Sequence, residues 1–175
     1  MKEKVSNTKL IYKGKILNLR LDEVILPNGK KTTREIIEHG NSVAILPLID
    51  DKILFVEQYR RPLDKALLEI PAGRLEKGED IEECAKRELE EETGYKAGSI
   101  KKLTCAYLAP GYSSELIHIF LAENLKKTKP NPDEDEFIKT AILDKKEALK
   151  KIMNREITDS KTIIGILFYS QNKTR

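Results

Sequence analysis

The sequence RELEEETG, from Arg87 to Gly94, places four glutamates within five residues and ends on a glycine. Like charges at this density repel one another, and the C-terminal end of a helix is the unfavourable end for anions. Two explanations are open at this point. The run is either a solvated helix end or a place where a cation binds.

The residues before this run predict a helix from Asp80 to Thr93. Asp80 is a typical N-cap, and Glu83 stands three residues further on, as in a capping box. Gly94 suits the position just after the last turn, where the backbone often turns left-handed. The sequence therefore gives this helix a defined start and a defined end.

The apolar face of this helix becomes acidic in its last turns. At about 100° per residue, one face collects four apolar or small side chains, namely Ile81, Cys84, Ala85 and Leu89. Glu88 falls in the middle of that face, Glu92 beside it and Glu91 at its edge, whereas Glu90 points away. Carboxylates facing inward are costly unless they are paired or bound to a metal ion. Clustered carboxylate oxygens suit Mg²⁺ or Mn²⁺, which favours the cation explanation.

Most of the remaining chain predicts β-strands, several of them joined by turn sequences such as PNGK at 27–30. Apolar patterns place strands at 16–26, 32–40, 42–49, 53–60, 66–73, 101–110, 115–125 and 138–143. Two further helices are predicted, one over 144–157 and one capped by Asp159 or Ser160. Strands with inserted helices indicate an α+β fold of the α/β/α sandwich type, in which a mixed sheet lies between helices.

Composition excludes several classes of function. The 175 residues favour one domain with a small appendage, and a net charge of +3 gives no electrostatic signature of nucleic-acid binding. The longest apolar run is too short to span a membrane, and the first ten residues lack a secretory apolar segment. Cys84 and Cys105 form no CxxC pair. We therefore expect a cytoplasmic protein with two buried, reduced thiols.

The stretch GRLEKGEDIEECAKRELEEETGY begins at Gly73 and extends the acidic run upstream. It resembles the Nudix box, G-x5-E-x7-R-E-U-x-E-E-x-G-U, in which U is aliphatic. The matching positions are Gly73, Glu79, Arg87, Glu88, Leu89, Glu91, Glu92 and Gly94. The last position departs from the pattern, because Tyr95 stands where an aliphatic residue is usual.

The resemblance implies a Nudix fold over residues 41–175, preceded by a small antiparallel sheet over residues 1–40. It implies a metal site of two or three Mg²⁺ or Mn²⁺ ions, with catalytic roles for Glu91 and Glu92. The implied ligands are the Ala72 carbonyl and the carboxylates of Glu88, Glu91 and Glu92. Gly73 would allow a tight backbone path, Glu79 and Arg87 would form a structural ion pair, and Gly94 would end the helix.

Sequences outside the box are similar to the ADP-ribose pyrophosphatase branch of this family. They are VEQYRRP and LEIPAG before the box, APGYSSE after it, and REIIEHGNSVAILPL near the N-terminus. The branch implies Mg²⁺-dependent hydrolysis of ADP-ribose to AMP and ribose 5-phosphate. Two alternatives remain open: a pyrophosphatase for another nucleotide sugar such as GDP-mannose, and a non-catalytic regulator that binds ADP-ribose.

The same resemblance assigns residues that bind the nucleoside diphosphate sugar. Arg60 would contact the phosphates, and Glu115 would lie near the terminal ribose. Arg34 and Glu35 would reach the adenosine end from the neighbouring subunit of a strand-swapped homodimer. For each of these residues the alternative is an ordinary surface position on a strand or loop.

The acidic stretch PDEDEF resembles the loop that carries the general base in this branch. A general base must come within hydrogen-bond reach of its water, and a loop can close on bound substrate. Glu136 is the first choice for the base and Glu134 the second, and a solvated acidic loop is the alternative. His118, inside LIHIFL, is expected to pack as a strand residue rather than act as the base.

Overall fold

The computed structural model describes residues 2–131 and 137–172. The chain forms two compact units: one comprises Met1–Asn41 and Tyr107–Leu116, the other Ser42–Ala106 and Ile117–Arg175. The first unit therefore contains the expected N-terminal region and adds the segment 107–116, which the sequence alone placed with the rest of the chain. Within the described residues, no helix has both the length and the apolar character needed to cross a bilayer.

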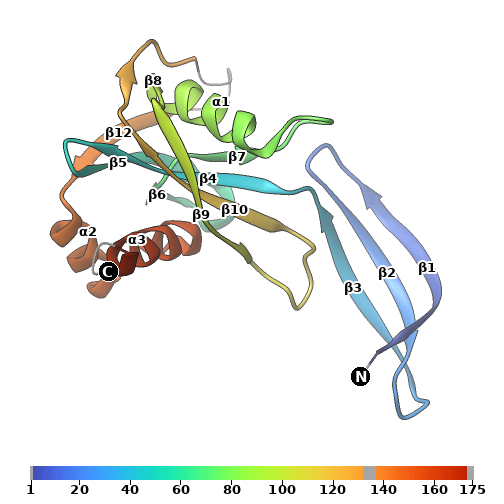
Figure 1. Cartoon of the computed structure of the whole chain (residues 1–175). Coiled ribbons are helices and arrows are strands. Elements are labelled where there is room, and N and C mark those ends of the chain that lie inside the picture. Colours follow the sequence, from blue (N-terminus) through green and yellow to red (C-terminus); the bar gives the residue numbers. More distant parts are fainter. Residues whose placement is uncertain (1, 132–136, 173–175) are drawn as a thin grey trace. The chain divides into compact units, whose positions relative to one another are not determined.

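The first unit is a three-stranded antiparallel sheet in the order β1-β2-β3 (Figure 1). Its strands are β1 (Lys4–Lys13), β2 (Leu17–Ile25) and β3 (Lys31–His39). The predicted turn between β2 and β3 contains Gly29 at a φ of 83°, a conformation that glycine adopts without strain. The added segment is hydrogen-bonded to Ile37 of β3. The Ile37 N–H donates to the Tyr112 carbonyl at 2.7 Å, and the Ile37 carbonyl accepts from the Ser114 N–H at 3.0 Å.

The second unit is built on a mixed sheet with the main order β12-β5-β4-β10-β9, to which β6 and β7 add through β5 and β4. Strand β4 runs parallel to β10 and antiparallel to β5 and β7. A short pair, β8 with β11, lies apart from this sheet. The strands are β4 (Ser42–Ile49), β5 (Lys52–Arg60), β6 (Lys65–Glu69), β7 (Ala72–Arg74), β8 (Tyr95–Lys96), β9 (Ser99–Tyr107), β10 (Leu116–Glu123), β11 (Lys126–Lys127) and β12 (Ile138–Leu143).

Helices cover both faces of this sheet (Figure 1). They are α1 (Ile81–Thr93), α2 (Lys145–Met153) and α3 (Ser160–Asn172), and a 3₁₀ turn (Arg61–Leu63) follows β5. Phe120 of β10 packs in one cluster with Leu89 of α1, whereas the next residue back, Ile119, lies close to Gly165 of α3. Successive strand side chains point to opposite faces, so a strand buried on both faces reads as the continuous apolar run seen in β4. The expected α/β/α sandwich is confirmed.

Local signals set the limits of α1 as predicted, with one difference. Asp80 Oδ1 accepts hydrogen bonds from the N–H groups of Glu82 and Glu83 at 2.8 and 3.2 Å. Gly94 ends the helix at a φ of 71°, and its N–H donates to the Glu90 carbonyl. The Glu83 carboxylate pairs with Lys86 at 2.6 Å instead of completing the capping box. The helix after Asp144 is shorter than predicted, because it stops at Met153.

The two cysteines differ. Cys84 of α1 is buried, and burial raises the pKa of its thiol to about 12, so it stays protonated. Cys105 is exposed, and the prediction that both thiols are buried is wrong for this residue. Cys105 lies on β9, the last strand in the order of the sheet, where side chains are covered less fully than on β4.

Candidate active site

Strand β7 lies against the acidic end of helix α1 at Gly73. A Cβ atom placed on Gly73 would lie 1.9 Å from the Glu88 carboxyl carbon and about 2 Å from each of its oxygens. Any larger residue would therefore displace the Glu88 carboxylate from this position. Glycine allows the close approach of the β7 backbone to Glu88, and both belong to the predicted metal site.

Arg87 connects the loop before the helix to two of the predicted metal ligands. Its Nε and Nη2 donate to the two carboxylate oxygens of Glu79 at 2.8 and 3.0 Å. Its Nη1 donates to Glu88 Oε1 at 2.8 Å and to Glu91 Oε2 at 2.9 Å. The expected pairing of Glu79 with Arg87 is present, and the same guanidinium also holds Glu88 and Glu91.

These contacts change the acidity of both partners. The hydrogen bond from Arg87 lowers the pKa of Glu79 to about 2, against an ordinary value of 4.5. The hydrogen bond with Glu79, aided by the charge of Glu88, raises the pKa of Arg87. Both groups are therefore fully charged at neutral pH, and the loop before α1 is tied to the helix by a permanent ion pair.

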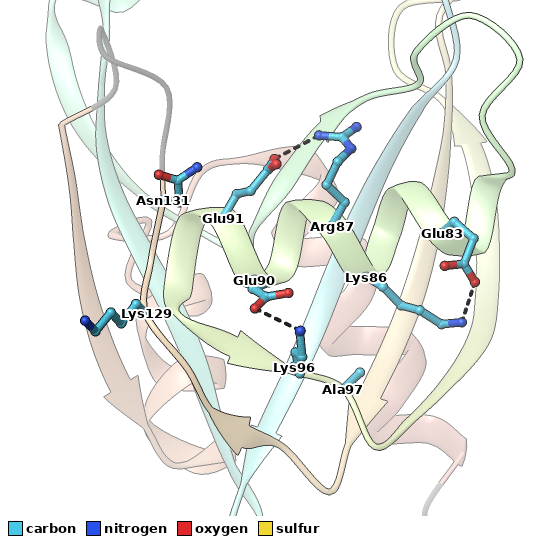
Figure 2. Close-up of a pocket in the computed structure, with 9 residues that line it drawn as sticks. All are labelled: Glu83, Lys86, Arg87, Glu90, Glu91, Lys96, Ala97, Lys129 and Asn131. Atoms are coloured by element: carbon cyan, nitrogen blue, oxygen red, sulfur yellow. Dashed lines mark hydrogen bonds and ion pairs between the residues drawn. The ribbon is translucent and has the colours of Figure 1, made fainter.

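Glu92 and Glu90 lie in different surroundings, as the helical periodicity predicts. Glu92 is 5% exposed, and its Oε2 accepts from the Ala72 N–H at 3.3 Å. Glu90 lies on the outer side of α1, where its carboxylate is 3.4 Å from Lys96 Nζ (Figure 2). Glu91 is the most exposed of the three inward carboxylates, with 36% of its side chain accessible. The helix therefore presents one buried and two half-buried carboxylates along the predicted metal face.

Across residues 2–131 and 137–172, no three His, Cys, Asp or Glu side chains form a ready-made metal site. Glu88 and Glu91 are hydrogen-bonded to Arg87, and Glu92 accepts from the Ala72 N–H. The donor set still fits a divalent cation in kind, because carboxylate oxygens are the ligands that Mg²⁺ prefers. Glu88 and Glu91 would have to turn from Arg87 to join Glu92 around one ion.

A hollow of about 510 Å³ opens on the outer side of α1 (Figure 2). Its lining residues are Glu83, Lys86, Arg87, Glu90, Glu91, Lys96, Ala97, Lys129 and Asn131. Most of its charges are paired with each other, and Glu88 and Glu92 do not line it. At one end the Asn131 N–H donates to the Glu91 carbonyl at 3.0 Å. The hollow thus borders the metal face without containing it.

Arg60, the predicted phosphate contact, is engaged by a residue that the sequence analysis passed over. Its Nε and Nη2 donate to the two carboxylate oxygens of Glu69 at 2.8 and 2.7 Å. Glu69 is 1% exposed and lies at the end of β6, within the stretch LEIPAG. A glutamate in an apolar strand, ALLEI, is the signal that could have identified it.

The residues expected at the adenosine and ribose ends lie in the first unit. Arg34 donates to Glu3 at 2.6 Å, and Glu115 Oε1 is 3.8 Å from His39 Nδ1. Arg34 and Glu35 are consecutive in β3, so their side chains point to opposite faces of the sheet. One face of this sheet can therefore present only one of the two to a ligand.

The predicted general bases Glu136 and Glu134 lie outside the described residues. His118 is buried at 6% exposure, as expected for a packed strand residue, and burial lowers its pKa so that it is neutral. Neither ring nitrogen of His118 has a hydrogen-bond partner among the described residues.

Sequence profiles of two known domains together match almost the whole chain. The profile of the NUDIX domain matches residues 38–161. The profile of the nucleoside diphosphate sugar hydrolase N-terminal domain matches residues 3–37. The border between the two matches lies close to the end of β3.

Individual relatives cover most of the chain and most of their own length. An ADP-ribose pyrophosphatase of Bacillus subtilis is 44% identical over 96% of this chain and 92% of its own. A methanol dehydrogenase activator of Bacillus methanolicus is 45% identical over 95% and 91% of the two chains. A GDP-mannose pyrophosphatase of Yersinia enterocolitica is 39% identical over a smaller share, 79% of this chain and 77% of its own.

A solved structure of an ADP compounds hydrolase has the same fold. It superimposes with a TM-score of 0.89 at 20% sequence identity, over 98% of this chain and 94% of that one. At this identity the likeness bears on the fold alone.

Proposed function

Because this chain belongs to the NUDIX family, we propose that it is an ADP-ribose pyrophosphatase, which hydrolyses ADP-ribose to AMP and ribose 5-phosphate. The observation that carries the proposal is the acidic end of α1, where Glu88 lies against Gly73 and Glu92 is buried beside Ala72. The ADP-ribose pyrophosphatase of Bacillus subtilis, which matches along nearly the whole chain, supports this choice of substrate.

The proposed site holds a divalent cation on the inward face of α1. The carboxylates of Glu88, Glu91 and Glu92, with the Ala72 carbonyl, would hold Mg²⁺ or Mn²⁺ there. A bound ion of this kind neutralises a diphosphate and lowers the pKa of an attacking water. Arg87 lies beside two of these carboxylates, so it keeps their charge compensated until the cation arrives.

Other residues act on the substrate and on the water. Arg60 would bind the diphosphate and stabilise the charge that develops on it in the transition state. Glu136, or Glu134 as second choice, would accept the proton of the attacking water. Glu115 would contact the ribose end of ADP-ribose, and whichever of Arg34 and Glu35 lies on the ligand-facing side of β3 would contact the adenosine end.

We also propose that the protein is a strand-swapped homodimer in which the N-terminal sheet completes the neighbour's site. Strand β1 supports this arrangement because it leaves apolar side chains uncovered, among them Val5, Leu10, Ile11 and Tyr12 at 50–59% exposure. Uncovered apolar side chains on a sheet edge are typical of contact surfaces.

A panel of ADP-ribose, NADH, ADP-glucose and GDP-mannose tests the proposal, with and without Mg²⁺. We expect the highest kcat/KM for ADP-ribose, with release of AMP and no turnover in EDTA. Light scattering of the active protein should give twice the mass of one chain. Preferred turnover of GDP-mannose with release of GMP would replace ADP-ribose by that substrate. Binding of ADP-ribose without turnover of any compound would instead make the chain a regulator.

A further inference from the structure

An ion cluster at the start of α3 reaches Arg60 through Glu69, and its members other than Arg60 have no role in the function proposed above. Lys161, the second residue of α3, donates to Glu69 Oε2, the oxygen that also accepts from Arg60 Nη2. Lys161 Nζ lies 3.0 Å from Asp159 Oδ1 as well. Two cations and two carboxylates therefore alternate from Asp159 to Arg60.

The same turn holds the backbone beside Glu69. The Thr162 hydroxyl accepts from the Ile70 N–H at 2.8 Å and donates to Asp159 Oδ2 at 2.6 Å. Asp159 Oδ2 also accepts from the Thr162 N–H at 3.0 Å, which caps the helix. Consecutive residues of α3 thus hold the side chain of Glu69 and the backbone of Ile70, two residues before Ala72.

Exposure differs between the members of this cluster. The Glu69 side chain is 1% exposed and that of Lys161 is 9% exposed, whereas that of Arg60 is 37% exposed. Both oxygens of Glu69 fix the plane of the Arg60 guanidinium, since a two-point pair allows one orientation. The Nη1 group of Arg60 takes no part in this pair. The cluster is therefore anchored in the core and ends in the partly exposed side chain of Arg60.

Lys161 also shares the negative charge of Glu69. Because the Glu69 carboxylate accepts from both Arg60 and Lys161, less of the positive charge of Arg60 is cancelled than in a pair of Arg60 with Glu69 alone. Asp159 pairs with Lys161, so the four groups together carry no net charge. Hydrogen bonds with Glu69 and the charges of Glu69 and Glu92 raise the pKa of Arg60, so Arg60 stays cationic near the acidic end of α1.

We propose that Lys161 and Glu69 are positioning residues for the reaction: they hold the Arg60 guanidinium in the orientation that binds the substrate diphosphate. The proposal rests on the proposed function. Buried ion pairs often serve the fold alone, and this is the alternative that the test must exclude.

The test compares Lys161→Gln and Lys161→Met with Lys161→Arg, and uses Lys151→Gln as the matched control. Lys151 also forms a lysine–glutamate pair, at 2.7 Å to Glu156, but on the surface of the same unit. KM and kcat for ADP-ribose with Mg²⁺ are measured together with the melting temperature. The Kd of the non-hydrolysable α,β-methylene analogue of ADP-ribose gives a readout that is independent of turnover.

Both neutral variants should raise KM and Kd by about 10-fold or more, the size of effect typical of residues that orient a binding group. Lys161→Arg should recover most of the loss, and Lys151→Gln should leave all constants unchanged. Wild-type KM and Kd in a folded neutral variant, with only a lower melting temperature, would overturn the proposal. Failure of both neutral variants to fold would also overturn it, since Lys161 would then serve the fold. A wild-type protein that neither binds the analogue nor hydrolyses ADP-ribose would instead overturn the proposed function.

Discussion

The acidic end of α1 and the ion cluster at the start of α3 are both built from inward-facing charges, but their charge balance differs. At the acidic end of α1, Arg87 bonds to three carboxylates, and Glu92 accepts from the Ala72 N–H. At α3, Glu69 is bonded by both Arg60 and Lys161.

This difference separates two uses of buried charge. Several inward carboxylates held around one cation repel one another, so the acidic end of α1 suits a metal ion. A carboxylate with two cations is already compensated, so the cluster at α3 suits a fixed support. Substitutions of Glu92, Gly73 and Glu79 test the acidic end of α1, and their expected effects decrease in that order.

Glu92→Gln should cause the largest loss. The amide keeps the shape of the side chain and can still accept from the Ala72 N–H, but it removes one negative charge from the metal face. We expect kcat to fall about 10²–10³-fold, as when one electrostatic contributor to a transition state is removed. Circular dichroism should show an intact fold. Glu90→Gln is the control on the outer side of the same helix. Full activity of Glu92→Gln would refute the proposal that the inward face of α1 binds a metal ion.

Gly73→Ala should cause the second-largest loss of activity. The added methyl group would overlap the Glu88 carboxylate, so Glu88 or β7 must move. Displacement by about 1 Å at a reacting centre costs about 10²-fold in rate. The Mg²⁺ concentration that gives half-maximal turnover should also be higher than for the wild type. Gly40→Ala has no atom within 4 Å of its new Cβ and should leave activity unchanged. Equal behaviour of the two variants would contradict the close approach at Gly73.

Glu79→Gln should have the smallest effect and should depend on pH. The folded pKa of Glu79 is about 2, below its ordinary 4.5, so its pair with Arg87 stabilises the fold above pH 4.5 and loses this effect as pH falls toward 2. Above pH 5 the free energy of unfolding of the variant should be about 1–2 kcal/mol lower than that of the wild type. Hydrogen bonds to charged groups are strong, but solvent screens this pair. The gap in melting temperature, about 4 °C, should close toward pH 2. A gap independent of pH would show that the ion pair does not contribute.

Local patterns predicted the features that depend on neighbouring residues in the chain. The inward side of α1, its cap at Asp80, its end at Gly94 and the strands on either side follow from periodicity and turn residues. Cys105 was assigned wrongly, because its exposure depends on which strand lies at the edge of the sheet. The short pair of β8 with β11 was missed, because two-residue strands leave no periodic pattern.

The sequence by itself determined the family, the helix that carries the acidic face and the carboxylates that share that face, because all of these depend on short, fixed spacings. The tertiary structure alone decided that Gly73 lies against Glu88 and that Glu69 joins Arg60 to Lys161. Lys161 and Glu69 are 92 residues apart, and no local pattern relates residues at that distance. Only the packing of α3 against the sheet brings them together. A buried carboxylate is costly unless a cation pairs with it, and here the tertiary structure brings that cation from a distant part of the chain.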